Sequence, residues 1–172
     1  CTSRADYYCY VGRLSEEKGV RSLLEAASKV KHELRIAGGG PLTDELKAKY
    51  AHCPNIKFLG HLDAHGVASL LSQAKCSVMP SVCYENNPLG VIESLCAGTP
   101  VVGANIGGIP ELISADTGII FESGNAEALA TGIDMAMSRT WHHPDIKAEA
   151  ISRFSPESHL KILARLYSKT TD

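Results

Sequence analysis

Two cations flank a turn between an apolar run at 7–11 and the helical pattern that follows it. Arg13 offers a planar guanidinium whose fork matches phosphate oxygens, and Lys18 offers a compact point charge. At the carboxyl end of a strand, these two side chains could hold a diphosphate between them. The alternative is a solvated loop in which Lys18 pairs with Glu16 or Glu17.

Two glutamates mark a second loop and the helix predicted over 88–96. Glu85 lies before this helix and Glu93 lies inside it, with seven residues between them. A helix N-terminus presents unpaired N–H groups and a partial positive charge, so it favours an anion. Gly90, in the first turn, lets a ligand approach the backbone closely. This loop and helix are therefore a candidate anion site with carboxylates beside it.

The surroundings of Glu93 follow from the apolar residues near it. Leu89, Ile92 and Cys96 form a stripe at helical spacing, which predicts a buried face beside the carboxylate. A carboxylate next to a buried face needs a partner. Vicinal ligand hydroxyls are one candidate, and an arginine or lysine from elsewhere in the domain is the other.

A glycine-rich loop, 38–41, separates another apolar run from the next helical pattern. It nearly matches the dinucleotide fingerprint G-x-G-x-x-G, but Thr43 stands in place of the third glycine. The following strand ends in Leu59-Gly60, where that fingerprint has an acidic residue. The nicotinamide interpretation is therefore weakened. What remains is a loop that lets the backbone approach a ligand, or a plain tight turn.

Short apolar runs alternate with amphipathic patterns along nearly the whole sequence. The predicted strands are 7–11, 34–37, 56–59, 76–79, 101–103 and 118–121. The predicted helices are 19–30, 42–51, 67–74, 88–96, 109–113, 126–137, 145–154 and 157–168. Strands separated by helices pair in parallel through right-handed crossovers. We expect one doubly wound α/β domain over 1–172, with about six parallel strands, helices on both faces and extra C-terminal helices.

The loops at the carboxyl ends of these strands are where such a sheet binds ligands. Five of them can be placed on the sequence: 12–18, 38–41, 60–63, 80–87 and 104–108. The cations, the glycines and the first glutamate all fall in these loops. The second glutamate falls in the helix that one of them enters.

The composition is that of a soluble globular domain, with 44% apolar and 21% charged residues over 172 positions. Lys and Arg number 17 against 19 Asp and Glu, and the cations are scattered, so no nucleic-acid partner is expected. No apolar run approaches the roughly 18 residues of a membrane helix. The six cysteines include no Cys-x-x-Cys pair, which favours reduced thiols in a cytosolic protein over a zinc or disulfide framework. Because the chain opens at Cys1 without a Met or a signal segment, we expect a domain from a longer protein.

Several short motifs follow one another in a fixed order. They are Gly12-Arg13-Leu14 with Glu17-Lys18-Gly19, Gly38-Gly39-Gly40-Pro41, Phe58-Leu59-Gly60, Pro80-Ser81, Tyr84-Glu85 through Glu93, Ala97-Gly98-Thr99-Pro100-Val101-Val102, and Gly107-Gly108-Ile109-Pro110-Glu111. In order and spacing, this set resembles the C-terminal domain of family 4 (group 1) retaining glycosyltransferases. The resemblance covers 7–165. Each motif is weak alone, and the ordered set is specific.

The resemblance implies a GT-B architecture, in which two Rossmann-like domains face a cleft and the second holds a nucleotide-sugar donor. By position, it implies that Arg13 and Lys18 clamp the donor diphosphate, that Glu93 binds the ribose and that Glu85 contacts the transferred sugar. It places the base near 58–60. The further donor-binding positions that it implies are Gly12, Gly39, Gly40, Leu59, Gly60, Asn87, Leu89 and Gly90.

The segment after the first glutamate departs from the common pattern of these relatives. Many of them have Gly-Phe-Gly-Leu there, whereas this chain has Asn-Asn-Pro-Leu at 86–89. Pro88 removes one N–H donor, and Asn86 and Asn87 add side-chain amides. The Asn-x-Pro form resembles a variant of the motif, and it leaves the donor sugar open.

The activity that the resemblance implies is metal-independent transfer of a sugar, with retention of configuration, in polysaccharide or glycoconjugate synthesis. No cofactor is implied, and the sequence has no Asp-x-Asp pair that would hold a metal. The expected partners are a nucleotide-sugar and an N-terminal domain of the same polypeptide, without which this chain alone should be inactive. The expected location is cytoplasmic, with membrane contact only through that other domain. A GT-B-type sugar-nucleotide epimerase and a non-catalytic nucleotide-sugar-binding module remain as alternatives.

Overall fold

A computed structural model describes residues 4–155 of the chain, and strands alternate with helices along it. The strands are β1 (Tyr7–Val11), β2 (Glu33–Ala37), β3 (Ile56–Gly60), β4 (Cys76–Met79), β5 (Val101–Ala104) and β6 (Gly118–Phe121). The helices are η1, a 3-10 turn (Glu16–Lys18), α1 (Val20–Lys29), α2 (Thr43–Lys49), α3 (Ala64–Gln73), α4 (Leu89–Cys96), α5 (Ile109–Leu112), α6 (Ala126–Ser138) and α7 (His143–Phe154). The helix predicted over 157–168 lies outside the described residues.

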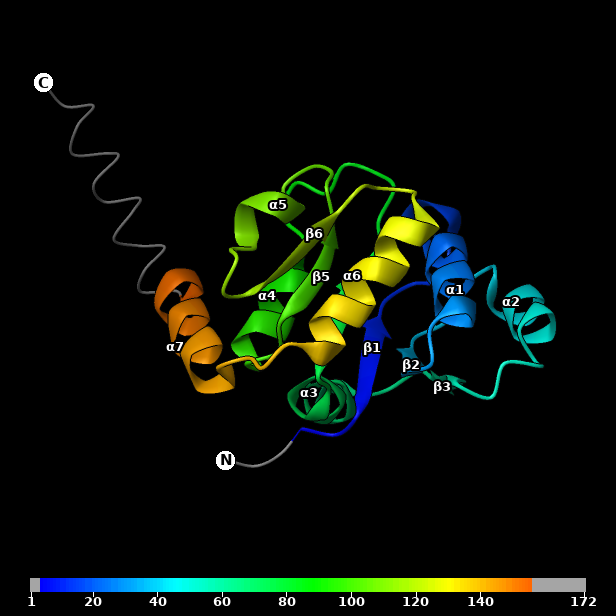
Figure 1. The fold of residues 1–172 in the computed structure, drawn as a ribbon, viewed down its shortest axis with the longest axis horizontal. Coiled ribbons are helices and arrows are strands. Elements are labelled where there is room, and N and C mark those ends of the chain that lie inside the picture. The colour runs from blue at the N-terminus through cyan, green and yellow to red at the C-terminus, as the bar shows by residue number, and fades with distance from the viewer. Residues whose placement is uncertain (1–3, 156–172) are drawn as a thin grey trace, which may run out of the picture.

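The six strands form one parallel sheet in the order β3-β2-β1-β4-β5-β6. The chain winds outward from β1 to β3, returns to place β4 beside β1, and then winds outward to β6 on the other side. Figure 1 shows β2 and β3 on one side of β1 and β5 and β6 on the other. The winding therefore reverses between β1 and β4, where Tyr8 pairs with Cys76 and Cys9 pairs with Ser77. This is the strand order of a Rossmann-like, doubly wound fold, and the predicted fold class is confirmed.

Helices cover both faces of the sheet. Side chains alternate along β1, so Tyr8 and Tyr10 pack in one core cluster while Tyr7 and Cys9 pack in another. The helices α1 and α6 lie side by side over the first face, and α3 and α4 cover the opposite one (Figure 1). The last described helix, α7, packs against α4.

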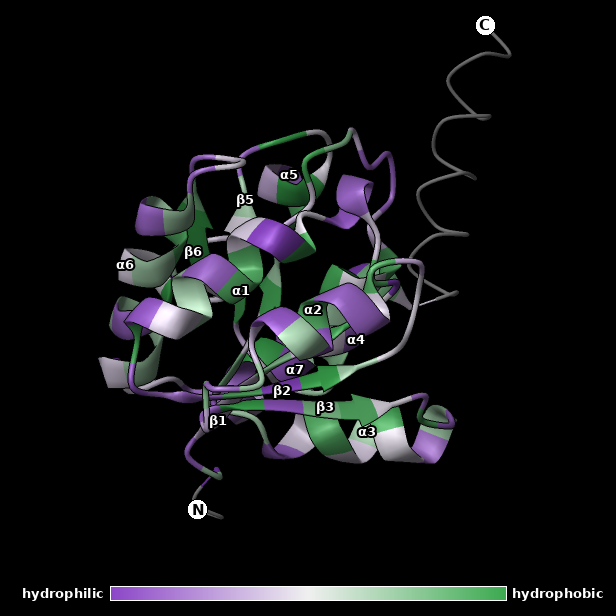
Figure 2. Ribbon diagram, turned by 90° about the vertical axis from the view of Figure 1, so that its right-hand side faces the viewer, coloured by the Kyte–Doolittle hydropathy of each residue, from purple (hydrophilic) through white to green (hydrophobic). Residues whose placement is uncertain are grey.

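Burial follows this layering. The strands β5 and β6 are largely hydrophobic in Figure 2, whereas the surrounding helices carry both hydrophobic and hydrophilic bands. In α1, Leu23, Leu24 and Ala27 are fully buried while Glu25 and Lys29 are exposed. Burying a leucine side chain stabilises the fold by roughly 1.5–3 kcal/mol. The packed core thus fixes the strands whose carboxyl ends carry the candidate residues.

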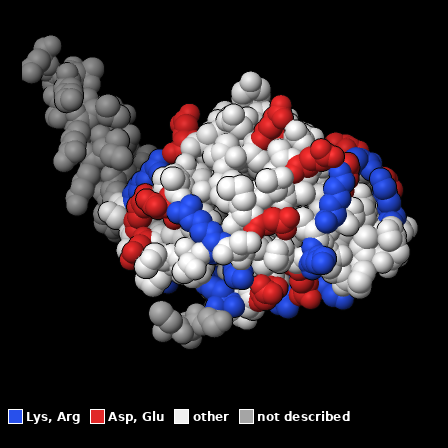
Figure 3. All heavy atoms as spheres, viewed as in Figure 1, with Lys and Arg blue, Asp and Glu red and all other residues white. Residues whose placement is uncertain are grey.

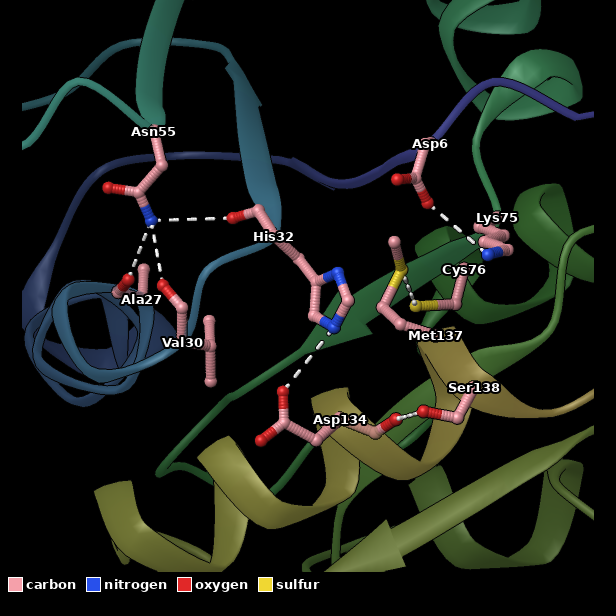
Figure 4. Close-up of polar contacts among 10 residues, drawn as sticks. All are labelled: Asp6, Ala27, Val30, His32, Asn55, Lys75, Cys76, Asp134, Met137 and Ser138. Carbon is pink, nitrogen blue, oxygen red and sulfur yellow. Dashed lines mark hydrogen bonds and ion pairs between the residues drawn. The ribbon is translucent and has the colours of Figure 1, made fainter.

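Polar side chains tie the loops at the amino ends of the strands to the helices (Figure 4). The side-chain amide of Asn55 donates to the carbonyls of Ala27 and Val30, at 2.9 and 3.1 Å, and so caps the C-terminal end of α1. The ring of His32 lies 3.5 Å from a carboxylate oxygen of Asp134 in α6. These contacts hold the helices over the sheet from the edge opposite the candidate loops.

The helix boundaries match the expected ranges within two residues, except at the start of α3. This helix begins at Ala64 rather than at 67, because Asp63 accepts a hydrogen bond from the N–H of Gly66 at 2.7 Å and so caps it. The start of α7 is His143 rather than 145, and Pro144 occupies the first turn, a position that suits proline.

The surface carries charges of both signs. Lysine, arginine, aspartate and glutamate are interspersed on the face shown in Figure 3. Among the helices of residues 4–155, none combines the length and the apolar character needed to cross a bilayer. The cysteines from Cys9 to Cys96 are free thiols.

Candidate functional site

A cavity of about 390 Å³ opens at the carboxyl ends of β1 and β4, where the winding of the sheet reverses. Doubly wound sheets bind their ligands at this place. The walls come from the two strands, from the loop after each of them and from the first turns of α4. The lining residues are Tyr10, Val11, Gly12, Lys18, Met79, Glu85, Asn87, Pro88, Leu89, Gly90 and Glu93.

A second cavity, of about 320 Å³, adjoins the first and shares Val11 and Gly12 with it. It opens at the ends of β1 and β2, and its walls include Arg13, Gly39 and His61. The two cavities lie next to each other along the carboxyl edge of the sheet. An extended ligand could occupy both.

Lys18 and Glu85 form an ion pair in the wall of the first cavity. Lys18 is the last residue of η1, and Glu85 lies in the loop between β4 and α4. The two side chains are 32% and 19% exposed. The alternative in which Lys18 pairs with Glu16 or Glu17 is therefore wrong. Glu16 contacts Arg21 in α1 instead, because the 3-10 turn separates its side chain from that of Lys18.

Close backbone packing brings the loops of Lys18 and Glu85 together. Gly19 has a φ of 66°, and a Cβ built on it would lie 1.8 Å from the carbonyl oxygen of Pro80. Only glycine fits both this left-handed conformation and this approach. The N–H of Val82 also donates to the carbonyl of Glu17 at 3.0 Å. The loop after β1, residues 12–18, and the loop after β4, residues 80–87, are therefore held against each other beside the cavity.

Glu85 is held through its backbone and its side chain. The N–H of Gly108, in the loop after β5, donates to the carbonyl of Glu85 at 2.7 Å. The hydroxyl of Ser81 donates to Oε1 of Glu85 at 3.1 Å, and Ser81 is fully buried. The sequence analysis does not assign a role to Ser81, because residues 81–85 lie in a loop and their spacing there does not indicate a contact.

The N-terminus of α4 presents free donors to the cavity. Pro88 has no N–H, and within the described part of the chain no acceptor binds the N–H of Leu89 or Gly90. Gly90 lies close to the end of Met79, since a Cβ on it would come within 2.6 Å of the Met79 methyl. The helix end thus combines its partial positive charge with two unpaired donors.

The buried face of α4 differs from the predicted stripe. Val91, Ser94 and Leu95 face the core, whereas Leu89 is 62% exposed. The prediction that Leu89 belongs to a buried stripe is wrong, because Leu89, in the first turn of α4, faces the cavity rather than the core. Glu93 is exposed and lines the cavity, and no lysine, arginine or histidine of residues 4–155 pairs with its carboxylate. The alternative ion pair for Glu93 is therefore absent from this part of the chain.

Arg13 and Tyr10 lie on either side of Gly12. The side chain of Arg13 is exposed and lines the second cavity, while its carbonyl accepts a hydrogen bond from the Tyr10 hydroxyl at 2.8 Å. Burial raises the pKa of Tyr10, so the phenol stays neutral and keeps donating. A Cβ on Gly12 would come within 2.8 Å of that hydroxyl. Tyr10 therefore shapes the turn that carries Arg13.

The predicted site residues fall into three groups in the structure. The first cavity brings together Gly12, Lys18, Glu85, Asn87, Leu89, Gly90 and Glu93, and the second contains Arg13 and Gly39. Neither cavity is lined by the other three predicted residues, Gly40, Leu59 and Gly60. The carbonyl of Gly60 does accept a hydrogen bond, at 2.7 Å, from the N–H of Gly38, which lines the second cavity. Tyr10 and Met79 were not predicted as site residues. Their signal in the sequence is their position at the carboxyl ends of two apolar strands.

The positive charge at this site comes from the side chains of Lys18 and Arg13 and from the N-terminus of α4. Among the residues that the structure describes, no group of three or more His, Cys, Asp or Glu side chains is placed to hold a metal ion. The arrangement is suited to an anion that also carries hydroxyl groups, because cations and free N–H donors face the cavity together with two carboxylates.

The structure defines a Rossmann-like domain with a cavity at its switch point, and comparison with known proteins gives the family. The family model for glycosyl transferases group 1 matches residues 5–139. The chain therefore belongs to the group 1 glycosyltransferases, and its fold is that of their C-terminal GT-B domain.

Three relatives illustrate the range of the likeness. An uncharacterised glycosyltransferase of Methanocaldococcus jannaschii is 30% identical, over 92% of this chain and 43% of that protein. A GDP-mannose-dependent phosphatidylinositol dimannoside mannosyltransferase of Mycobacterium tuberculosis is 35% identical, over 78% of this chain and 36% of that protein. The Anabaena protein Alr3699/HepE, solved in complex with UDP, is similar in fold, with a TM-score of 0.83 and 21% identity, over 96% of this chain and 49% of that one. The chain thus spans less than half the length of these relatives.

Proposed function

We propose that this chain is the donor-binding half of a glycosyltransferase and that it binds a nucleoside-diphosphate sugar in the cavity at the carboxyl ends of β1 and β4. The observation that carries the proposal is the meeting of Lys18, Glu85, Glu93 and the free N–H groups of α4 around one cavity at the switch point. These groups recognise the three parts of such a donor, namely its phosphates, its ribose and its sugar.

Each part of the donor has a partner in this proposal. Lys18, with Arg13 from the adjoining cavity, binds the diphosphate. Glu93 accepts hydrogen bonds from the ribose hydroxyls, and Glu85 accepts them from the transferred sugar. The base extends into the second cavity, past Gly39 and toward the segment 58–60. The donor would then lie along the carboxyl edge of the sheet, across both cavities.

The chemistry that these residues support is departure of a nucleoside diphosphate. Negative charge builds on the diphosphate as the bond to the sugar breaks, and fixed cations at that place stabilise it. Lys18, Arg13 and the N-terminus of α4 can supply this stabilisation without a metal. Retention of configuration and metal independence are parts of this proposal that rest on the family resemblance and on the absence of an Asp-x-Asp pair.

The acceptor belongs to a part of the protein beyond this chain in our proposal. The chain covers 43% of the archaeal relative and 36% of the mannosyltransferase, so the rest of such a protein would bind the acceptor. We propose a role in polysaccharide or glycoconjugate synthesis in the cytoplasm. The relatives name different nucleotides, GDP in one case and UDP in another, so the base must be determined by experiment.

Calorimetric titration of the 172-residue chain with UDP, GDP, ADP and NAD tests this function. We expect at least one nucleoside diphosphate to bind and NAD to bind no better than background. Lys18→Ala should weaken that binding by about 1.5–3 kcal/mol, because a charge-assisted contact is lost. Lys147→Ala, which removes an exposed cation from α7, is the matched control. Binding of NAD without any diphosphate would refute the proposal, as would an unchanged affinity in the Lys18 variant.

A further inference from the structure

Two donors share one oxygen of Glu85. The ammonium of Lys18 and the hydroxyl of Ser81, at 3.1 Å, both contact Oε1. In the described residues no donor contacts Oε2, and Glu85 lines the first cavity. The carboxylate is therefore fixed at one oxygen, and its other oxygen is available to a ligand.

Ser81 has few other ways to satisfy its hydroxyl. The residue is fully buried, and a buried hydroxyl without a hydrogen bond destabilises the fold. The other neighbour of its Oγ is the thioether of Met79, a weak acceptor at 4.0 Å. The hydroxyl of Ser123 donates to the carbonyl of Ser81 at 3.1 Å and fixes the backbone there. The Ser81 hydroxyl is thus held in place and directed at Glu85.

Lys18 faces a competing demand once a donor binds. In our proposed function it contacts the diphosphate, which carries more negative charge than a single carboxylate. An ammonium that moves to the phosphates leaves Glu85, whose side chain is only 19% exposed. Ser81 is then the one remaining side-chain donor to Glu85 among the residues that the structure describes. Without it, the carboxylate would be free to turn away from the cavity.

We propose that Ser81 is a positioning residue for Glu85, holding its carboxylate toward the sugar while Lys18 passes from Glu85 to the donor diphosphate. The inference rests on the proposed function and goes beyond it, because it assigns a role to a buried residue that touches no part of the donor. It also makes the ion pair of Lys18 and Glu85 a contact that diphosphate binding exchanges for a new one.

The test compares a nucleoside diphosphate with the matching sugar nucleotide on the same protein. Calorimetry of the 172-residue chain uses UDP with UDP-glucose and GDP with GDP-mannose, and the pair that binds is carried forward. In Ser81→Ala we expect the affinity for the sugar nucleotide to fall about tenfold, the order expected for a hydrogen bond to a charged group. The affinity for the free diphosphate should stay within about twofold, because a hydroxyl on Glu85 does not act on phosphate.

Three further variants separate positioning from a general structural loss. Ser81→Thr keeps the hydroxyl and should restore the sugar-nucleotide affinity. Ser138→Ala removes an exposed hydroxyl at the end of α6 that lines neither cavity, so it should leave both affinities unchanged. Glu85→Gln should strengthen binding of the free diphosphate by about threefold, because Lys18 is released from an ion pair of modest strength.

The outcomes distinguish this inference from the proposed function. If the wild-type chain binds no nucleoside diphosphate, the proposed function fails and the inference falls with it. If diphosphate binds and Lys18→Ala weakens it, the function stands. In that case the inference is overturned by a Ser81→Ala variant that weakens both ligands equally or neither, or by a Glu85→Gln variant that binds the free diphosphate less tightly than wild type.

Discussion

At the scale of single residues, the ion pair of Lys18 and Glu85 is more buried than the ion pairs at the surface. Lys18 and Glu85 are 32% and 19% exposed and line a cavity. Arg21 joins Glu16 and Glu45 in a network whose side chains are 42% to 66% exposed. Exposed pairs of that kind contribute about 0–1 kcal/mol each. The pair in the cavity is screened less by water, so a ligand that competes for it changes the electrostatics of the whole site.

Glu93 gives the first prediction at this scale. Its carboxylate is exposed to the cavity, and no cation of residues 4–155 pairs with it, so a ligand has no internal partner to displace. Glu93→Ala should weaken nucleoside diphosphate binding by about 1.5–3 kcal/mol, because the ribose hydroxyls lose a charged acceptor. Calorimetry measures the change, with the exposed Glu149→Ala in α7 as the control. An unchanged affinity in a folded Glu93 variant would exclude the ribose contact.

At the scale of elements, a backbone contact rather than a side chain joins the two loops that carry the ion pair. Gly19 ends η1 in a left-handed conformation and lies against the carbonyl of Pro80, at the end of β4. Gly124 has a similar φ of 78°, but no atom lies within 4 Å of a Cβ built on it. A substitution at Gly124 therefore tests the left-handed backbone conformation alone, whereas a substitution at Gly19 tests that conformation together with the close approach to Pro80.

Substitution of these glycines gives the second prediction. Gly124→Ala should lower the free energy of unfolding by about 1–2 kcal/mol, the cost of a left-handed conformation. Gly19→Ala should lower it further, because the new methyl group would overlap with the Pro80 carbonyl, and it should also weaken diphosphate binding by displacing Lys18. Urea denaturation and calorimetry measure the two effects. Equal losses in both variants would show that the loops do not depend on this approach.

Arg4 joins two helices at the opposite edge of the sheet and gives the third prediction. Its guanidinium donates to the carbonyls of Leu71 near the end of α3 and of Ala97 and Gly98 after α4, each at 3.0 Å, and to the hydroxyl of Thr99 at 2.8 Å. A cation at two helix C-termini is favoured by both helix dipoles. Arg4→Ala should lower the free energy of unfolding by about 1.5–3 kcal/mol.

Urea denaturation of the Arg4 variant measures that loss. The exposed Lys31→Ala, just after the end of α1, serves as its control and should change stability by less than about 0.5 kcal/mol. Nucleotide affinity should be the same in both variants, because neither residue lines the first cavity or the second. A similar stability in the two variants would mean that Arg4 does not join the helices.

At the scale of the whole molecule, stability should depend on pH through His143. This residue begins α7, and its Nδ1 lies 2.9 Å from the carbonyl oxygen of Gly98, where α7 packs against the end of α4. Burial lowers the pKa of His143 below its ordinary value, and the charge of Arg4 lowers it further. The folded protein therefore resists protonation of this ring more than the unfolded chain does.

The sign of the fourth prediction follows from that difference. Below the ordinary pKa of 6.5 the unfolded chain takes up the proton first, so the free energy of unfolding falls as the pH is lowered toward the folded pKa. We expect a lower Tm at about pH 5.5 than at about pH 7.5. His143→Gln should reduce this difference, and the exposed His52→Gln should not. A Tm difference that survives intact in the His143 variant would rule this group out.

The architecture could be predicted from the sequence because each element carries its own signal. Alternating apolar runs and helical patterns fix the element order, and helices between strands require parallel pairing. The start of α3 differs from the prediction because the cap at Asp63 lies four residues before Val67, where the apolar periodicity of the helix begins. The orientation of α4 was missed because the cavity, and not the core, receives Leu89. Periodicity does not distinguish those two environments.

The site was only partly predictable for a related reason. The glycines, the cations and the glutamates lie in loops whose place in the sheet follows from topology. The partner of Lys18 does not follow from topology. Glu85 is 67 positions away in the sequence, yet it lies nearer to Lys18 in space than the acidic neighbours Glu16 and Glu17 do. Ser81 and Tyr10 act through buried hydroxyls, and a sequence does not show which buried hydroxyl points at which acceptor.

A crystal structure of the chain with the nucleoside diphosphate that binds best tests the central claim most directly. We expect the diphosphate beside Lys18 and Arg13 at the N-terminus of α4, the ribose hydroxyls on Glu93 and the base in the second cavity. Lys18 should have left Glu85 for the phosphates, while Ser81 still contacts Glu85. A nucleotide bound elsewhere, with the cavity at β1 and β4 empty, would contradict the proposed site.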